Sequence, residues 1–107
     1  MNDRELLELA AKAAGIELSD WSSSENGFIR YHFVTRHIWN PLDDDADAFR
    51  LAVKLGLFVN VWLEAKQVYV DFAVSKKDVL EPFGNDPYAA TRRAIVRAAA
   101  EIGRRTE

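Results

Sequence analysis

The chain has 107 residues with 49% hydrophobic and 29% charged positions and a formal net charge of −3, which predicts one domain over 1–107 and gives no bulk attraction to nucleic acid. The absence of cysteine excludes a disulfide framework, a thiolate zinc site and a cysteine nucleophile. No apolar run reaches the ~20 residues of a membrane span, and the first residues do not resemble a secretory signal, so we expect a cytoplasmic protein without membrane contact.

The N-terminal part predicts a helix followed by a strand. We expect the helix over Asp3–Ala14, because Asn2 and Glu5 have capping-box spacing and Gly15 suits the left-handed position after the last turn. A strand is expected over Phe28–Val34. In this strand, apolar and polar side chains alternate through Ile29, Arg30, Tyr31, His32 and Phe33.

A second helix is predicted after the segment Trp39–Leu42. One of the aspartates Asp43, Asp44 or Asp45 caps it, and Gly56 ends it. Its core-facing stripe is expected to contain Ala46, Phe49, Ala52 and Val53.

The same acidic run has the one-three-five spacing of a calcium loop at Asp43, Asp45 and Asp47. The rest of such a loop is missing, because Ala48 stands at position six in place of Gly and Lys54 at position twelve in place of Glu. We therefore interpret the run as a helix cap, with a divalent-metal site as the alternative.

Residues 57–74 predict a β-hairpin. Its apolar positions are Leu57, Val59, Val61, Leu63, Val68, Val70, Phe72 and Val74. With a two-residue loop at Ala65-Lys66, every pair on one face is apolar: Leu63 with Val68, Val61 with Val70, and Val59 with Phe72. Ala-Lys is a poor match to a tight turn, so a longer loop from Glu64 to Gln67 is the alternative.

After a predicted loop over Lys76–Asn85, the last helix begins at Pro87, with Asn85 or Asp86 as cap, and runs to about Gly103. Its inward side is expected to hold Tyr88, Ile95, Ala99 and Ile102. Its opposite side carries Arg93, Arg97 and Arg104. A solvated charged face is the plain interpretation of these arginines, and contact with nucleic-acid phosphates is the alternative.

The order α-β-α-β-β-α predicts an α+β fold with a three-stranded, mainly antiparallel sheet and helices packed on one face. The opposite face of that sheet would carry Phe58, Trp62 and Tyr69, with Arg30 and His32 from the first strand. Three large aromatics on one face form an apolar patch of the kind that marks protein contacts. These five residues are therefore the candidate interaction surface.

Three uses of this face remain open from the sequence. A terminal segment or the loop with Trp21 covers it, or a protein partner or a second copy binds it, or its aromatics stack nucleic-acid bases. We predict a non-enzymatic protein-interaction module. The alternative is a nucleic-acid-binding domain that uses the outer aromatics, Arg30 and the three arginines of the last helix.

Motifs for catalysis or cofactor binding are missing. The five glycines stand singly, so no glycine-rich phosphate loop is formed, and no GxSxG element is present. His32 and His37 are five residues apart and match no zinc motif, so we interpret them as surface or strand histidines. We therefore expect no catalytic residue, cofactor or metal.

Three segments together resemble a known group of proteins: Asn2–Ile16, Trp39–Leu57 and Ala89–Glu101. The central one reads WNPLDDDADAFRLAVKLGL and has the form WNPLxDDxDAxRLAVKLGL. The chain resembles small uncharacterised proteins of tailed bacteriophages and prophages. The resemblance implies an accessory role in a bacterial cytoplasm and supplies no catalytic residues. It also suggests that Trp39 and Pro41 fix the entry to the second helix, with a recognition surface as the rival interpretation.

Overall fold

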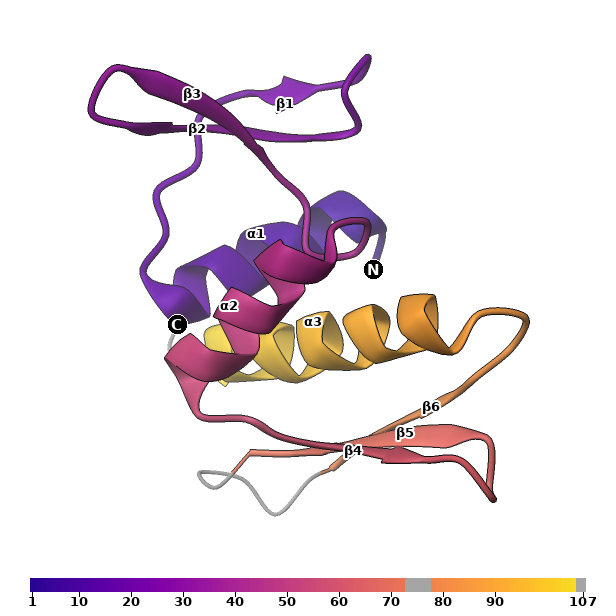
Figure 1. Ribbon diagram of the computed structural model, residues 1–107. Coiled ribbons are helices and arrows are strands. Elements are labelled where there is room, and N and C mark those ends of the chain that lie inside the picture. The colour runs from indigo at the N-terminus through magenta and orange to yellow at the C-terminus, as the bar shows by residue number, and fades with distance from the viewer. Residues whose placement is uncertain (73–77, 106–107) are drawn as a thin grey trace.

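The computed structural model describes residues 1–72 and 78–105, in which three helices lie between two three-stranded antiparallel sheets (Figure 1). The predicted α+β class is confirmed. The N-terminal sheet has the strand order β1-β2-β3, and the C-terminal sheet has the order β4-β5-β6. The elements are α1 (Asp3–Ala14), β1 (Trp21–Ser22), β2 (Gly27–His32), β3 (Thr35–Trp39), α2 (Asp45–Leu55), β4 (Phe58–Trp62), β5 (Gln67–Asp71), β6 (Val79–Pro82) and α3 (Pro87–Arg105).

The predicted helix starts are confirmed by capping side chains. In α1 the Asn2 side chain accepts from the Glu5 N–H at 2.9 Å, and the Glu5 carboxylate accepts from the Asn2 N–H at 3.3 Å. Of the three aspartates before α2, Asp44 is the N-cap. Before α3, the Asp86 carboxylate accepts from the N–H two residues on at 2.9 Å. Each cap satisfies a backbone donor that the helix itself leaves unpaired.

Helix α3 lies at the centre of the molecule and is built from small residues. Its buried positions include Ala90, Ala94, Ala98, Ala99, Ala100 and Gly103. A Cβ at Gly103 would lie 2.0 Å from the Leu9 carbonyl oxygen of α1, so the two helices approach too closely for any side chain there. This close approach makes α1 and α3 the platform on which the rest of the fold packs.

Two hydrophobic cores flank α3. The first joins α1, α2 and the base of the N-terminal sheet around Leu7, Phe28, Trp39, Leu51 and Val96. The second packs the C-terminal sheet on α3 through Val68, Val70, Phe72, Ala94 and Ala98. Each fully buried Val, Leu or Phe contributes about 1.5–3 kcal/mol to stability.

Asn40, a buried polar residue, holds the junction between β3 and α2. Its Nδ2 donates to the Asn26 carbonyl at 2.5 Å, and its Oδ1 accepts from the Leu42 N–H at 3.0 Å. The Asn40 N–H donates to the Asp47 carboxylate at 3.0 Å. Trp39 beside it is only 3% exposed. These contacts support a structural interpretation of the segment that begins at Trp39.

The prediction of a single three-stranded sheet is wrong. The first predicted strand ends at His32, Phe33 and Val34 form a two-residue turn, and the chain returns as β3. Because β3 and β1 pair with both edges of β2, that strand does not join the later hairpin. The C-terminal sheet is completed instead by β6, where a loop was expected.

The predicted hairpin forms, but its register is wrong by two residues. Val59 faces Val70, because the loop has the four residues 63–66 in place of two. A shift of two residues keeps every side chain on its predicted face, so the valines of β5 still point into the core. Val74 of the predicted strand and Lys76 at the start of the predicted loop lie outside the described residues.

Candidate functional site

The five residues predicted to form one surface lie on two separate sheets. Phe58, Trp62 and Tyr69 share the outer face of the C-terminal sheet, where Phe58 is 62% and Trp62 53% exposed. Arg30 and His32 lie on β2, on the other side of the helices (Figure 1). The prediction that the five meet is wrong, because β2 pairs with β1 and β3 rather than with β4 or β5.

The outer face of the C-terminal sheet is open to solvent. Leu80 of β6 faces Tyr69 and is 53% exposed, so it extends the apolar row. The loop with Trp21 lies elsewhere, since that ring packs edge-on against Phe28 with centroids 5.1 Å apart. A hydrogen bond to the Asp78 carboxylate raises the pKa of Tyr69 above its ordinary value.

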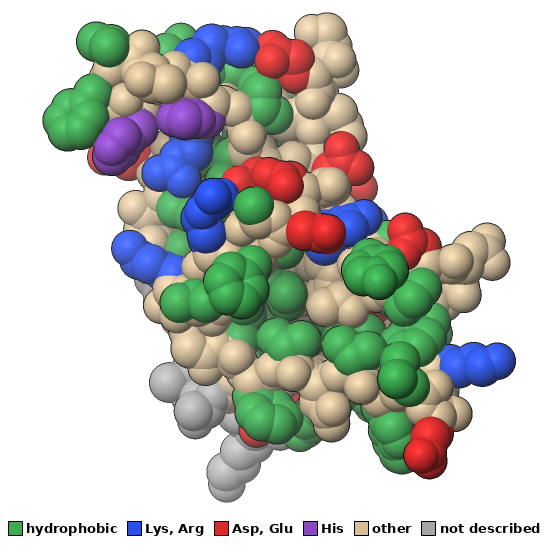
Figure 2. All heavy atoms as spheres, in the orientation of Figure 1, with side chains coloured by type: hydrophobic (Ala, Val, Ile, Leu, Met, Phe, Trp, Pro, Cys, Tyr) green, Lys and Arg blue, Asp and Glu red, His purple; other side chains and the backbone are tan. Residues whose placement is uncertain are grey.

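A second apolar surface is a groove of about 550 Å³ between α2, α3 and β4. Hydrophobic side chains gather over these elements in Figure 2. The side chains that line the groove include Phe49, Val53, Leu57, Val59, Tyr88 and Ile95. One charged pair lies in its lining, where Arg92 contacts Asp45 at 2.7 Å. We call this feature the apolar groove.

The rim of the apolar groove is made of side chains expected in the core. Phe49 is 68%, Val53 65% and Tyr88 71% exposed. The helix α2 instead turns Ala48 and Leu51 inward, and both are at most 2% exposed. Helix α2 has two adjacent apolar stripes, and its packing on α3 buries only one of them. The expected inward position of Phe49, Val53 and Tyr88 is therefore wrong, and the expected inward position of Ala46 is wrong for the same reason.

Within residues 1–72 and 78–105, strand β4 is a sheet edge that no other strand pairs with, and it lies beside this groove. It pairs with β5 on one side only, because the strand order is β4-β5-β6. Its five residues, FVNVW, contain no charge and no proline. The opposite edge, β6, carries Glu81 and Pro82. Charged residues and proline are the usual protection of an edge against pairing with another chain, and β4 lacks both.

The three arginines proposed for nucleic-acid contact are engaged within the chain. Arg93 contacts Asp3 at 3.2 Å. Arg97 pairs with Glu81 and donates to the Leu80 carbonyl at 3.1 Å. Arg104 pairs with the Glu101 carboxylate at 2.6 Å. Their charges are balanced by carboxylates, which favours the plain interpretation of a structural and solvated helix face.

The β2–β3 hairpin is a projecting arm (Figure 1) whose burial falls from base to tip. Phe33 and Val34 at the turn are 90% and 95% exposed, and Phe33 has a φ of 58°, a left-handed conformation that is rare for an aromatic residue. No acidic residue occurs between Phe28 and Trp39. Arg30 faces His37 across the strands, so the arm is basic as well as aromatic.

One arginine of the arm is neutralised by a carboxylate outside the arm. Arg36 makes two hydrogen bonds to the Glu25 carboxylate, at 2.6 and 3.1 Å. These bonds lower the pKa of Glu25 below its ordinary value and raise that of Arg36. The positive charge that the arm offers to an anion is therefore mainly that of Arg30.

A hollow of about 540 Å³ lies between the arm and the start of α2, and His32, His37, Arg50 and Asp47 help to line it. Burial raises the pKa of Asp47 above its ordinary value, while the Asn40 N–H acts in the opposite direction. Asp47 and the Asp44 cap also line the hollow, and Arg50 already pairs with the Asp47 carboxylate at 3.6 Å.

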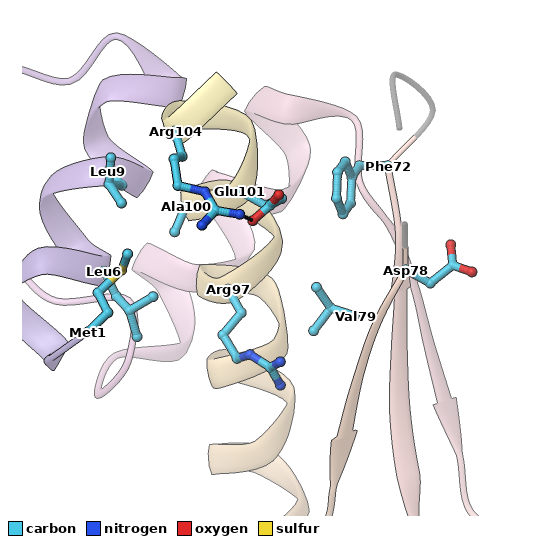
Figure 3. A pocket seen from close by; sticks show the side chains of 10 residues that line it. All are labelled: Met1, Leu6, Leu9, Phe72, Asp78, Val79, Arg97, Ala100, Glu101 and Arg104. Carbon is cyan, nitrogen blue, oxygen red and sulfur yellow. Dashed lines mark hydrogen bonds and ion pairs between the residues drawn. The ribbon is translucent and has the colours of Figure 1, made fainter. Parts of the chain in front are cut away.

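Figure 3 shows a smaller hollow of about 260 Å³ between α1, α3 and β6. Its charged side chains take part in contacts already described: Arg97 with Glu81, Arg104 with Glu101, and Asp78 with Tyr69. In Figure 3 the Asp78 side chain points away from the helices, while Val79 points toward them. These pairings favour a structural hollow over a reactive site.

Within residues 1–72 and 78–105, no group of three or more His, Asp or Glu side chains is placed to hold a metal ion. In the same ranges no helix is long and apolar enough to cross a membrane. Comparison with protein-family models, curated proteins and solved structures finds no match for this chain.

Of the two apolar surfaces, the sequence predicted the outer face of the C-terminal sheet and missed the apolar groove. It identified the aromatics on the outer face of β4, but it placed the groove side chains Phe49, Val53 and Tyr88 in the core. A signal for them is present in α2, where Ala48, Phe49, Ala52 and Val53 make an apolar band wider than one helix contact buries.

Proposed function

We propose that this chain is an accessory protein of a bacteriophage or prophage that acts by binding another protein, through the apolar groove and the adjoining edge of β4. The observation that carries the proposal is the exposure of Phe49, Val53 and Tyr88 around one groove, next to an edge strand without charge or proline. The phage origin is supported by the resemblance of the segment Trp39–Leu57.

The energetics of the groove favour a macromolecular partner. Burying a fully exposed Phe or Val side chain contributes about 1.5–3 kcal/mol, so Phe49, Val53 and Tyr88, each about two-thirds exposed, can together contribute several kcal/mol to a protein contact. The edge of β4 adds unpaired backbone N–H and C=O groups beside them, which can pair with an extended strand. An apolar groove beside a free strand edge is a combination that β-strand addition uses.

The test compares capture of a partner by four immobilised forms of the protein. The wild type, Phe49→Ser/Val53→Ser in the groove, Trp62→Ser on the outer face and Phe33→Ser on the arm are incubated with a lysate of a bacterial host, and retained proteins are identified by mass spectrometry. We expect the groove variant to lose a protein that the arm variant retains. If the groove variant and the arm variant retain the same proteins, the proposal is contradicted.

The exposure of all three sites makes this comparison clean. Each substituted side chain is more than half exposed, so the free energy of unfolding should change by less than about 0.5 kcal/mol for each single substitution. A loss of binding by the groove variant can then be assigned to the surface. Thermal unfolding of all four forms provides the control.

A second candidate function, nucleic-acid binding, is favoured by one feature, the β2–β3 arm. A two-stranded ribbon fits the major groove of DNA, and apolar tips such as Phe33 and Val34 can wedge between bases. Arg30 lies on this ribbon and makes no ion pair with another described residue. Gel shifts with single- and double-stranded DNA at low salt test it, with Arg30→Ala and Phe33→Ser as variants. No shift at low salt would reject this function.

A further inference from the structure

We propose that the partner at β4 is a second copy of this chain, paired antiparallel through the β4 edges about a twofold axis at Asn60. This inference rests on the proposed function and names its partner. It joins two three-stranded sheets into one six-stranded sheet with the order β6-β5-β4-β4-β5-β6.

The residue pattern of β4 is symmetric about its centre. Its sequence is Phe58-Val59-Asn60-Val61-Trp62, with an aromatic at each end, a valine inside each aromatic, and an amide in the middle. In antiparallel pairing about Asn60, each aromatic meets an aromatic and each valine meets a valine. An interface between identical copies related by a twofold axis has to be self-complementary in this way.

The symmetry extends beyond the strand on its inner face. Leu57 would face the partner's Leu63, and Val59 would face the partner's Val61. Val61 is 42% exposed in the single chain, although it lies on the face that packs toward the helices, and Leu63, in the turn that follows β4, is 72% exposed. A second copy therefore covers apolar side chains that the chain's own helices leave open.

Only this register pairs aromatic with aromatic on the outer face of the sheet and valine with valine on its inner face. A shift of two residues would place the Asn60 amide opposite Phe58 or Trp62 and leave one aromatic of each copy without a counterpart. A shift of one residue would place valines opposite outward residues and turn the helices of the second copy to the other side of the sheet. In the symmetric register, the two Asn60 amides face each other on the axis, where each can donate to the other.

Charges at the two ends of β4 complement this pairing. Glu64 follows the strand and is exposed, and Lys54 precedes it at the end of α2 and is also exposed. In this register Glu64 lies opposite the partner's Gly56, next to the helix end that carries the partner's Lys54, and Lys66 lies two residues beyond Glu64 at the same end. The strand itself carries no charge that a second copy would repel.

The other edge of the same sheet is less suited to self-pairing. In β6, Pro82 has no N–H to donate, and Glu81 already pairs with Arg97. The edge of β4 also borders the apolar groove, whose lining includes Val59. Because Val59 would face the partner's Val61, the second copy would extend the floor of the groove.

Cross-linking tests the register directly. The chain has no cysteine, so Asn60→Cys introduces a single thiol that would face its own copy on the axis. Directly opposite Cβ atoms lie about 4.5–5.5 Å apart, close to the range that a disulfide bridges. We expect most of this variant to become a covalent dimer under mild oxidation. Leu80→Cys, at a position on β6 that is also exposed, is the matched control and should stay uncross-linked.

Sedimentation velocity over a concentration series tests the assembly without a cross-link. We expect the wild type to form a two-chain species, and Asn60→Lys to weaken it by about fivefold because two like charges would face each other. Leu80→Lys places the same charge on the other edge and should leave the dimer intact. A wild type that stays monomeric, or a dimer that Asn60→Lys leaves unchanged, would overturn the inference.

These outcomes separate the inference from the proposed function. If the wild type is monomeric while Phe49→Ser/Val53→Ser abolishes capture of another protein, the second copy is wrong and the interaction site stands. If the groove variant changes neither capture nor assembly while Asn60→Cys forms a covalent dimer, the groove is wrong as an interaction site and the pairing of the β4 edges stands.

Discussion

The two sheets flank the same helices, but they expose apolar side chains in different ways. In the N-terminal sheet, burial is confined to the base near Phe28 and Trp39, and the tip around Phe33 is bare on both faces. In the C-terminal sheet, one face is packed on α3 by Val68 and Val70, and the exposed apolar residues lie on its outer face and along β4. The exposed apolar residues of β4 therefore belong to a sheet whose other face is packed against α3, whereas those at the tip of the arm have no packed layer beneath them.

The largest expected difference between the two sheets is the stability lost when one phenylalanine beside each sheet is truncated. Phe72→Ala should lower the free energy of unfolding by about 3–5 kcal/mol, because Phe72 is 1% exposed and its loss leaves a cavity. Phe33→Ala should change it by less than about 0.5 kcal/mol, because the side chain is 90% exposed. Denaturant unfolding measures both. Similar losses for the two variants would mean that the arm packs as the C-terminal sheet does.

The next effect concerns the platform that both sheets share. Gly103→Ala should lower the free energy of unfolding by about 1–3 kcal/mol, because the new Cβ meets the Leu9 carbonyl and forces α1 away from α3. Glu8→Ala, at an exposed position of α1, is the control and should be nearly neutral. If Gly103→Ala stabilises the protein, as Ala does in an unconstrained helix, the two helices are not in close contact.

A smaller effect separates capping from recognition in the segment between the two sheets. Asp44→Ala should cost about 1 kcal/mol of stability, because Asp44 accepts the Ala46 N–H at the start of α2. Asp43→Ala should cost less than about half of that, because Asp43 is not the capping residue. Thermal unfolding distinguishes them. Equal, small effects combined with loss of a bound partner would favour the recognition interpretation.

The smallest effect is a pH dependence at the same junction. Burial raises the folded-state pKa of Asp47 above its ordinary value of 3.8, so the folded protein holds this proton more tightly than the unfolded chain does. The resulting stability is fully present below the unfolded pKa and is lost as pH rises through the folded one. Asp47→Asn keeps an acceptor for the Asn40 N–H and does not ionise. As the pH rises from the unfolded-state pKa of Asp47 through its folded-state pKa, the stability of Asp47→Asn relative to wild type should therefore increase. Urea unfolding at a series of pH values measures this difference.

Local signals in the sequence predicted the helices well. The Asn2–Glu5 capping box, the aspartates before α2 and Pro87 each act through neighbouring backbone groups, so their effect can be read without knowing the rest of the fold. The faces of the hairpin were predicted for the same reason, because alternation is a local property of a strand.

What was missed depends on contacts distant in sequence. The turn at Phe33-Val34 contains neither Gly nor Asn, so β3 had no turn signal before it and a second sheet was not expected. The Pro82 residue marked a loop, although proline is tolerated at the end of an edge strand such as β6. The exposure of Phe49 depends on which stripe of α2 meets α3, and periodicity alone does not decide between two adjacent stripes.

Hydrogen–deuterium exchange measured at high and low protein concentration tests directly whether the interaction surface is the β4 edge with its apolar groove. We predict that amides of Phe58–Trp62 and of the α2 flank around Val53 gain protection as the protein assembles. Amides of the arm at Tyr31–Arg36 should exchange equally fast at both concentrations. If protection is confined to the arm, or is absent at β4, the β4 edge is not the interaction surface.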